Sequence, residues 1–107
     1  MDKNYTLVFD DVMVKQLKKA ANNQHIKEIL TKMLDKLEFS GPDAGELLDP
    51  RLSICEIKKK HPPIRLYFKH ILPTNEIYVF EFEIKNSIEK QKATIIKIKQ
   101  KASELKP

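Results

Sequence analysis

The chain has 107 residues, 41% of them hydrophobic, so it is long enough for one domain with one core and too short for two. Apolar residues recur throughout, which excludes a disordered chain although 33% of the residues are charged. No apolar run approaches the roughly 20 residues of a membrane-spanning helix, and the start shows no export signal. The single Cys55 has no disulfide partner, so we expect a cytoplasmic location.

The positive charge is concentrated in the second half of the chain. Residues 1–50 contain seven lysines and nine acidic residues, whereas residues 51–107 contain 13 lysines or arginines and six glutamates. The two halves therefore carry net charges of −2 and +7, which together give the +5 of the whole chain. A one-sided positive field attracts polyanions, nucleic acid first among them, although solvated lysine-rich surfaces are also common.

The first 23 residues predict a strand and a short helix. In the strand, over residues 5–9, alternate side chains share one apolar face: Tyr5, Leu7 and Phe9. Asp10 and Asp11 stand where a helix N-cap is expected. The helix that follows should end near residues 22–23, and it has apolar residues at spacings of three and four: Val14, Leu17 and Ala21.

A second, longer helix gives the clearest pattern in the chain. Six apolar residues recur at helical spacing: Ile26, Ile29, Leu30, Met33, Leu34 and Leu37. Gly41 and Pro42 should end this helix, because glycine tolerates a left-handed backbone and proline lacks an amide donor. We expect a loop after them.

From residue 52 the apolar period changes to two. Residues 52–59, 64–72 and 76–84 read as strands joined by short turns, which predicts an antiparallel meander. Ser87 can cap a final helix whose inward stripe comprises Ile88, Ile95, Ile98, Ala102 and Leu105. The predicted order is βααβββα, an α+β domain in which the helical hairpin packs on one face of a small, mostly antiparallel sheet.

Three segments of this scaffold, residues 53–58, 64–68 and 82–85, resemble segments of the RelE/ParE toxin superfamily, particularly of its HigB-like members. Residues 53–58 (SICEIK) resemble the family's strand ending in Glu-Leu-Arg, residues 64–68 (IRLYF) its Tyr-Arg-Val-Xaa-Tyr strand, and residues 82–85 (FEIK) its Phe-Xaa-Lys-Lys segment. The resemblance covers nearly the whole chain. It implies the toxin of a toxin-antitoxin pair, with an antitoxin, the ribosome and mRNA as partners.

The RNA-cutting members of this family cleave mRNA in the ribosomal A site by driving a ribose 2′-hydroxyl onto the adjacent phosphate. Such chemistry needs a base, cations that stabilise the phosphorane, and an acid for the leaving oxygen. Arg65 is the foremost candidate, because a guanidinium can bind phosphate through two parallel hydrogen bonds, although it could instead pair with Glu56. The resemblance adds Lys58 and Lys85 as contacts to the phosphate.

Side chains two apart in a strand share a face, so Glu56, Lys58 and Lys60 should point together. Arg65, Tyr67 and Lys69 should do the same on the next strand, leaving a basic face opposite the core. His61 could act as acid or base, or be a plain turn residue, and Tyr67 could stack on a base or only pack across strands. The expected RNA-binding set is Lys59, Lys60, Tyr67, Lys69 and Gln91.

Two departures from the family pattern leave other functions open. RNA-cutting relatives often carry a tyrosine early in the last helix, where this chain has Gln91, and Glu81 and Glu83 place negative charge near the site unless they are paired or turned away. The alternatives are a ParE-like gyrase poison and a RelE-like domain that only binds nucleic acid or a partner. The sequence has no clustered metal ligands, so we expect neither metal nor cofactor.

Overall fold

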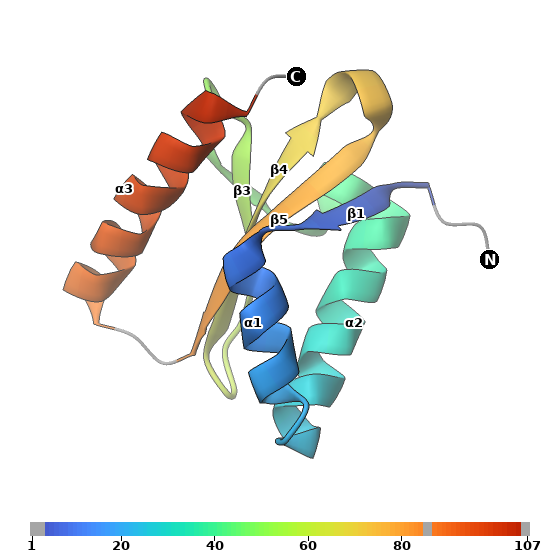
Figure 1. The fold of residues 1–107 in the computed structure, drawn as a ribbon, viewed down its shortest axis with the longest axis vertical. Helices are drawn as coiled ribbons and strands as arrows, with labels where there is room; N and C mark the ends of the chain where they lie inside the picture. The colour runs from blue at the N-terminus through green and yellow to red at the C-terminus, as the bar shows by residue number, and fades with distance from the viewer. Residues whose placement is uncertain (1–3, 85–86, 106–107) are drawn as a thin grey trace.

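The structure is a computed structural model and describes residues 4–84 and 87–105. It is an α+β fold in which α1 and α2 cover one face of a five-stranded open sheet and α3 covers the other (Figure 1). The helices and strands are β1 (Thr6–Phe9), α1 (Asp11–Ala20), α2 (Gln24–Ser40), β2 (Glu46–Asp49), β3 (Ile54–Lys59), β4 (Ile64–Ile71), β5 (Glu76–Ile84) and α3 (Ile88–Glu104), with short 3-10 turns at Gly41–Ala44 and Leu72–Thr74. None of these helices is long and apolar enough to cross a membrane.

The sheet has the strand order β1-β5-β4-β3-β2. β1 runs parallel to β5, and the other neighbours are antiparallel, which confirms the predicted meander. The predicted order βααβββα lacked β2, because the sequence pattern indicated a loop there. β2 has four residues, mostly exposed, and such a short edge strand carries no clear two-residue alternation.

The helical hairpin forms largely as the sequence predicts. The Asp10 carboxylate accepts the N–H of Val12 at 3.0 Å and caps α1, and Gly41 ends α2 with a φ of 56°. The predicted stripe of α2 is confirmed, since all six residues are buried or packed against the core. The stripe of α1 is corrected: Met13 is fully buried, whereas Val14 is 37% exposed.

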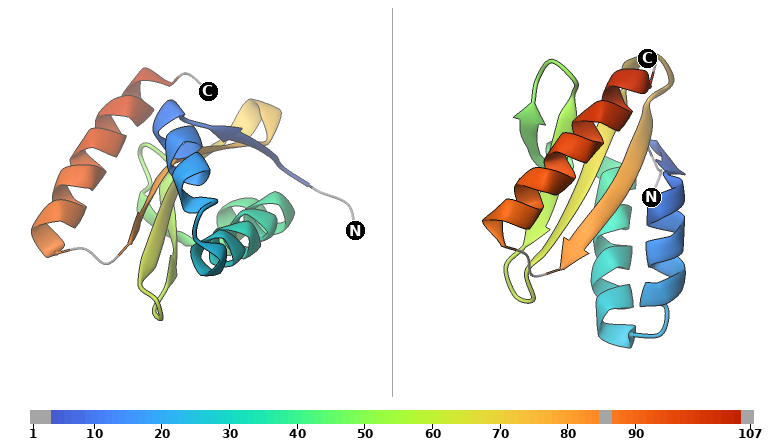
Figure 2. Two further views of the ribbon diagram at one scale, coloured as in Figure 1. Left: turned by 60° about the horizontal axis from the view of Figure 1, so that its bottom comes forward. Right: turned by 60° about the vertical axis from the view of Figure 1, so that its left-hand side comes forward.

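Two apolar clusters lie on opposite faces of the sheet. Figure 2 shows the helices that cover these faces, α1 and α2 on one side and α3 on the other. The larger joins the sheet to α1 and α2, and it contains Ile64, Leu66 and Phe68, as predicted for that face of β4. The smaller joins the sheet to α3 and consists of Ile54, Tyr67, Phe80, Ile98 and Ala102. The sequence predicted an open basic face opposite the core. This prediction is wrong for most of that face, because α3 covers it.

The stripe of α3 is confirmed for Ile98 and Ala102, with Ile95 and Leu105 packed at the edge. Ile88 is 71% exposed, so its predicted inward position is wrong. Ser87 caps the helix by accepting the N–H of Lys90, which places Ile88 in the first turn, before the helix reaches the apolar part of the sheet.

Candidate functional site

A basic pocket of about 360 Å³ opens between the β3–β4 hairpin and the first turns of α3. The right-hand view of Figure 2 shows this hairpin and the first turns of α3 at the same end of the sheet, and residues of both line the pocket. The residues that line the pocket are Lys58, Lys59, Lys60, Pro63, Ile64, Arg65, Glu83, Ile88 and Gln91. It thus brings together five residues singled out in the sequence: Lys58, Lys59, Lys60, Arg65 and Gln91. We call this site the hairpin pocket.

The sheet register sets the order of charges in the hairpin pocket. Lys58 of β3 lies directly opposite Arg65 of β4, and Arg65 lies opposite Glu83 of β5. Residues opposite one another on adjacent strands have Cβ atoms only about 4.5–5.5 Å apart. Two cations and a carboxylate therefore stand in one row across three strands.

The guanidinium of Arg65 is held by a buried carboxylate, that of Glu56. Its Nη1 donates to both carboxylate oxygens of Glu56, at 3.0 and 3.1 Å, and the Glu56 side chain is only 4% exposed. The Arg65 side chain is 37% exposed, and its Nη2 and Nε make no hydrogen bond with a described residue. The pairing with Glu56 considered from the sequence is thus present, and two of the guanidinium nitrogens stay available at the pocket.

Glu83 is buried at the inner end of the pocket. Its carboxylate accepts hydrogen bonds from the Tyr67 hydroxyl at 2.7 Å and from Thr94 Oγ1 at 3.0 Å. Burial of the Tyr67 hydroxyl and its bond to Glu83 both raise the pKa of Tyr67 far above its ordinary value, so this tyrosine is a neutral donor. The Glu81 carboxylate forms an ion pair with Lys97, whose Nζ lies 2.9 Å from Oε1 of Glu81. Of the two carboxylates that the sequence left as a source of repulsion, Glu81 is therefore paired with a cation, whereas Glu83 keeps its negative charge and is held by neutral donors.

Two residues of the predicted RNA-binding set lie outside the pocket. Tyr67 is fully buried beneath α3, so the expectation that its ring offers a stacking platform is wrong in this structure. Lys69 is also buried, and its Nζ donates to the carbonyl of Leu52 at 2.6 Å. Both side chains share a strand face with Arg65, as predicted, but α3 and the β2–β3 segment cover that face beyond Arg65.

The two other residues predicted to take part in catalysis are His61 and Lys85. His61 lies exposed in the turn between β3 and β4 and does not line the hairpin pocket, so its role as acid or base stays a prediction. Lys85, expected to contact the phosphate, lies outside the described residues. Within residues 4–84 and 87–105, no group of three or more histidine, cysteine or acidic side chains could hold a metal ion.

The sequence pattern did not identify three residues that line or support this pocket. The sequence pattern indicates only a negative charge at Glu83, predicts a core position for Ile88 and gives no signal for Thr94. The bond between Thr94 and Glu83 joins α3 to β5 and depends on how the helix packs. No local sequence signal could have found it, because the two residues meet only through the tertiary fold.

Comparison with known proteins reveals similarity at the level of structure. No family model matches the chain, and no curated protein matches it by sequence. Isolated E. coli RelE toxin superposes with a TM-score of 0.64 at 23% identity, over 88% of this chain and 98% of that chain. The intact E. coli RelBE toxin-antitoxin complex gives 0.63 at 23% identity, over 78% and 99%.

A more distant structure agrees. The RelBE2 toxin-antitoxin complex from Mycobacterium tuberculosis matches with a TM-score of 0.61 at 13% identity, over 76% of this chain and 98% of that chain. Each of these chains is covered almost from end to end. The predicted RelE-like architecture is therefore confirmed at the level of the fold.

Proposed function

We propose that this chain, which has the fold of the RelE toxins, is the toxin of a toxin-antitoxin pair and a ribosome-dependent mRNA endoribonuclease that works in the cytoplasm. Its partners would be the ribosome, mRNA and a cognate antitoxin. The similar solved structures include RelE bound to its antitoxin, which supports a protein partner of that kind. Metal or cofactor is not part of the proposal.

The observation that carries the proposal is the hairpin pocket itself. Three lysines and Arg65 line one cavity of about 360 Å³, although the sheet around it contains several carboxylates. Glu56 is paired with Arg65 and Glu81 with Lys97, and Glu83 is the one carboxylate in a lining that holds four cations. Positive charge at the pocket therefore remains available to a phosphate.

The pocket offers groups for each part of the reaction. Nη2 and Nε of Arg65 would clamp the phosphate and stabilise the phosphorane, and Lys58, opposite on β3, would add a second cation. Glu83 is the carboxylate that lines the pocket and would accept the proton of the 2′-hydroxyl. A lysine of the hairpin would donate to the leaving 5′-oxygen. Gln91 would contact the nucleotide from α3.

The experiment is expression of the protein in a translating extract, with primer-extension mapping of the mRNA. We expect codon-spaced cuts with the wild type and a loss of about 100-fold or more with Arg65→Ala, because a transition-state contact is removed. Lys58→Ala should reduce cutting about 10-fold or more. Lys32→Ala is the matched control, since Lys32 is an exposed lysine of α2 that lines none of the pockets described here, and it should cut like the wild type.

The outcome that would end the enzyme proposal is equally concrete. If mRNA stays intact while double-stranded DNA breaks accumulate in cells, the chain is a gyrase poison of the ParE kind. If neither occurs and the protein still binds RNA or a partner, it is a non-catalytic RelE-like domain. Cutting that persists undiminished in Arg65→Ala and Lys58→Ala would show that the chemistry lies elsewhere.

A further inference from the structure

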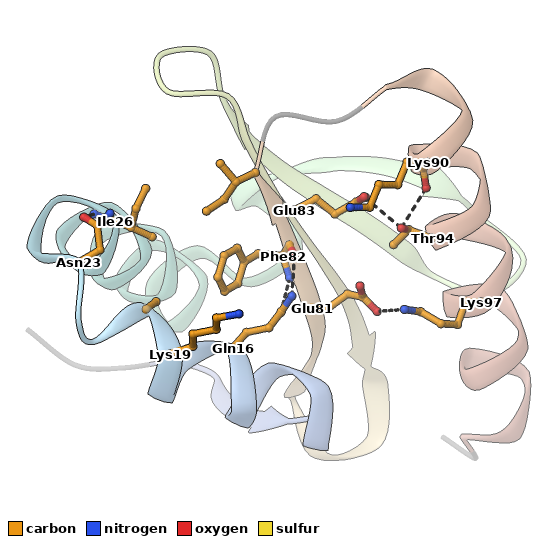
Figure 3. A pocket seen from close by; sticks show the side chains of 12 residues that line it. Gln16, Lys19, Asn23, Ile26, Glu81, Phe82, Glu83, Lys90, Thr94 and Lys97 are labelled. Atoms are coloured by element: carbon orange, nitrogen blue, oxygen red, sulfur yellow. Dashed lines mark hydrogen bonds and ion pairs between the residues drawn. The ribbon is translucent and has the colours of Figure 1, made fainter.

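β5 is longer than its neighbour β1, so part of one edge of β5 has no strand partner among the residues that the structure describes. β1 pairs with β5 only from Glu76 to Val79, whereas β5 continues to Ile84. On the remaining edge, Gln16 of α1 donates from Nε2 to the Phe82 carbonyl and accepts the Phe82 N–H at Oε1, both at 2.9 Å (Figure 3). These are the two hydrogen bonds that a residue of a neighbouring strand would make.

A second pocket, of about 510 Å³, runs along this edge between the α1–α2 hairpin and α3 (Figure 3). Ala20, Ile26, Phe82 and Ile84 give it an apolar lining. Because backbone groups alternate along a strand, Ile84 presents its N–H and C=O to the same side as Phe82. The pocket, which we call the β5-edge groove, therefore combines strand-type backbone bonding with apolar surface.

The charges of the β5-edge groove favour an acidic ligand. Three lysines line it, Lys19, Lys90 and Lys97, against two carboxylates, so the formal charge of the lining is +1. Glu81 is paired with Lys97, and Glu83 keeps its negative charge while it accepts hydrogen bonds from Tyr67 and Thr94. Lys19 and Lys90 form no ion pair with a described residue. Two exposed cations on opposite walls, one on α1 and one on α3, thus face the open edge of the strand.

We propose that the β5-edge groove binds an extended acidic peptide segment, which adds to β5 as a further strand and takes over the bonds now made by Gln16. Backbone pairing supplies affinity in such strand addition, and pockets for alternate side chains supply specificity. A single-stranded nucleic acid fits less well, because its backbone cannot form the paired strand-type bonds to the Phe82 N–H and C=O, and the Phe82 ring is only 7% exposed and so offers little surface for stacking. The proposal does not rest on the endoribonuclease function, although the groove shares Glu83 with the hairpin pocket.

The test uses a fluorescein-labelled peptide of about eight residues with alternating Glu and Val, a length and pattern suited to a strand. We expect saturable binding by fluorescence anisotropy, with amide shifts centred on Phe82 and Ile84 in nitrogen-15 NMR spectra. A peptide with proline at alternate positions should not bind, because it lacks the N–H groups of one edge. Failure of the Glu-Val peptide to bind overturns the proposal.

Variants of the chain separate strand addition from other binding. Gln16→Ala should tighten binding about threefold or more, since the competing carboxamide is gone; a weaker complex would contradict strand addition. Lys19→Glu and Lys90→Glu, both at exposed positions, should each weaken binding about fivefold, and the control Lys32→Glu should not change it. If oligouridylate displaces the peptide from the groove, the site is a nucleic-acid site and the proposal is wrong.

Discussion

The two faces of the sheet are built from different interactions. On the α1–α2 face, 14 buried residues form one apolar cluster. On the α3 face only five buried residues form the apolar cluster. Polar contacts also hold α3 on this face: Lys97–Glu81, Lys99–Asp49, Lys101–Asp10 and Thr94–Glu83. The first face holds the fold together through burial, which is non-directional. The second fixes side chains in defined orientations, because hydrogen bonds and ion pairs are directional.

This difference explains where the candidate site lies. Arg65 and Lys58 project from the α3 face at the end of the sheet that α3 does not fully cover, next to exposed Ile88. The buried carboxylates of Glu56 and Glu83 orient the pocket from the covered side. A wholly apolar face could not have held a guanidinium at the rim in a fixed position.

The largest expected effect tests the apolar face. Phe68→Ala removes a fully buried ring from the larger cluster and should lower the free energy of unfolding by about 3–5 kcal/mol, measured by urea denaturation. Ile98→Ala, on the α3 face, should cost less, since its cluster is smaller and its neighbours can collapse. If the two variants lose the same free energy of unfolding, apolar burial does not contribute more on the α1–α2 face than on the α3 face, and the comparison is wrong.

The second effect concerns a buried hydrogen bond on the α3 face. Tyr67→Phe keeps the ring but removes the donor to Glu83, so a buried carboxylate loses one of its partners. We expect the free energy of unfolding to fall by about 1–3 kcal/mol. If mRNA cutting is observed, it should also fall, because Glu83 lines the pocket. The matched control is Tyr78→Phe, which also keeps its ring and loses a hydroxyl, here the donor to Asp10 outside the hairpin pocket, and it should leave cutting unchanged.

A smaller effect should appear at acid pH. Burial of the Asp10 carboxylate acts to raise its pKa, but hydrogen bonds from Tyr78, Lys101 and the Val12 N–H outweigh it and lower the pKa below the usual 3.8. The folded pKa is depressed, so this stabilisation is present above the unfolded value and is lost as pH falls through the folded one. Asp10→Asn keeps the helix cap and should be less stable than the wild type near neutral pH. The difference should shrink at low pH in urea titrations.

The smallest effect is salt sensitivity of α3. Its lysines are partly exposed, and each exposed ion pair is worth only about 0–1 kcal/mol. Raising NaCl from about 50 mM to about 1 M should accelerate amide hydrogen exchange in α3 more than in α1 and α2, because the Debye length shrinks from over 10 Å to about 3 Å. Equal acceleration in all three helices would show that α3 docking does not depend on these pairs.

The sequence predicted the helical hairpin, the meander and the cap at Ser87 because these depend on local periodicity and local hydrogen bonds. It also selected Lys58, Lys59, Lys60, Arg65 and Gln91, which the structure places around one pocket. It missed β2, which is too short to show a pattern, and it placed Tyr67 and Lys69 on an open surface. The position of α3 decides whether these two side chains are exposed or buried. Helical periodicity alone does not say which sheet face a helix will cover.

The sequence by itself determined that the cations of the site come from the second half of the chain, because that half carries the net positive charge. Only the tertiary structure decided which of them stay exposed. α3 buries Tyr67, and the sheet register sets Lys58 beside Arg65 and Arg65 beside Glu83. The two strand contacts join residues 7 and 18 positions apart in sequence, and Tyr67 packs with Ile98 of α3, 31 positions away, so these contacts follow from strand pairing and helix packing, which no local pattern encodes.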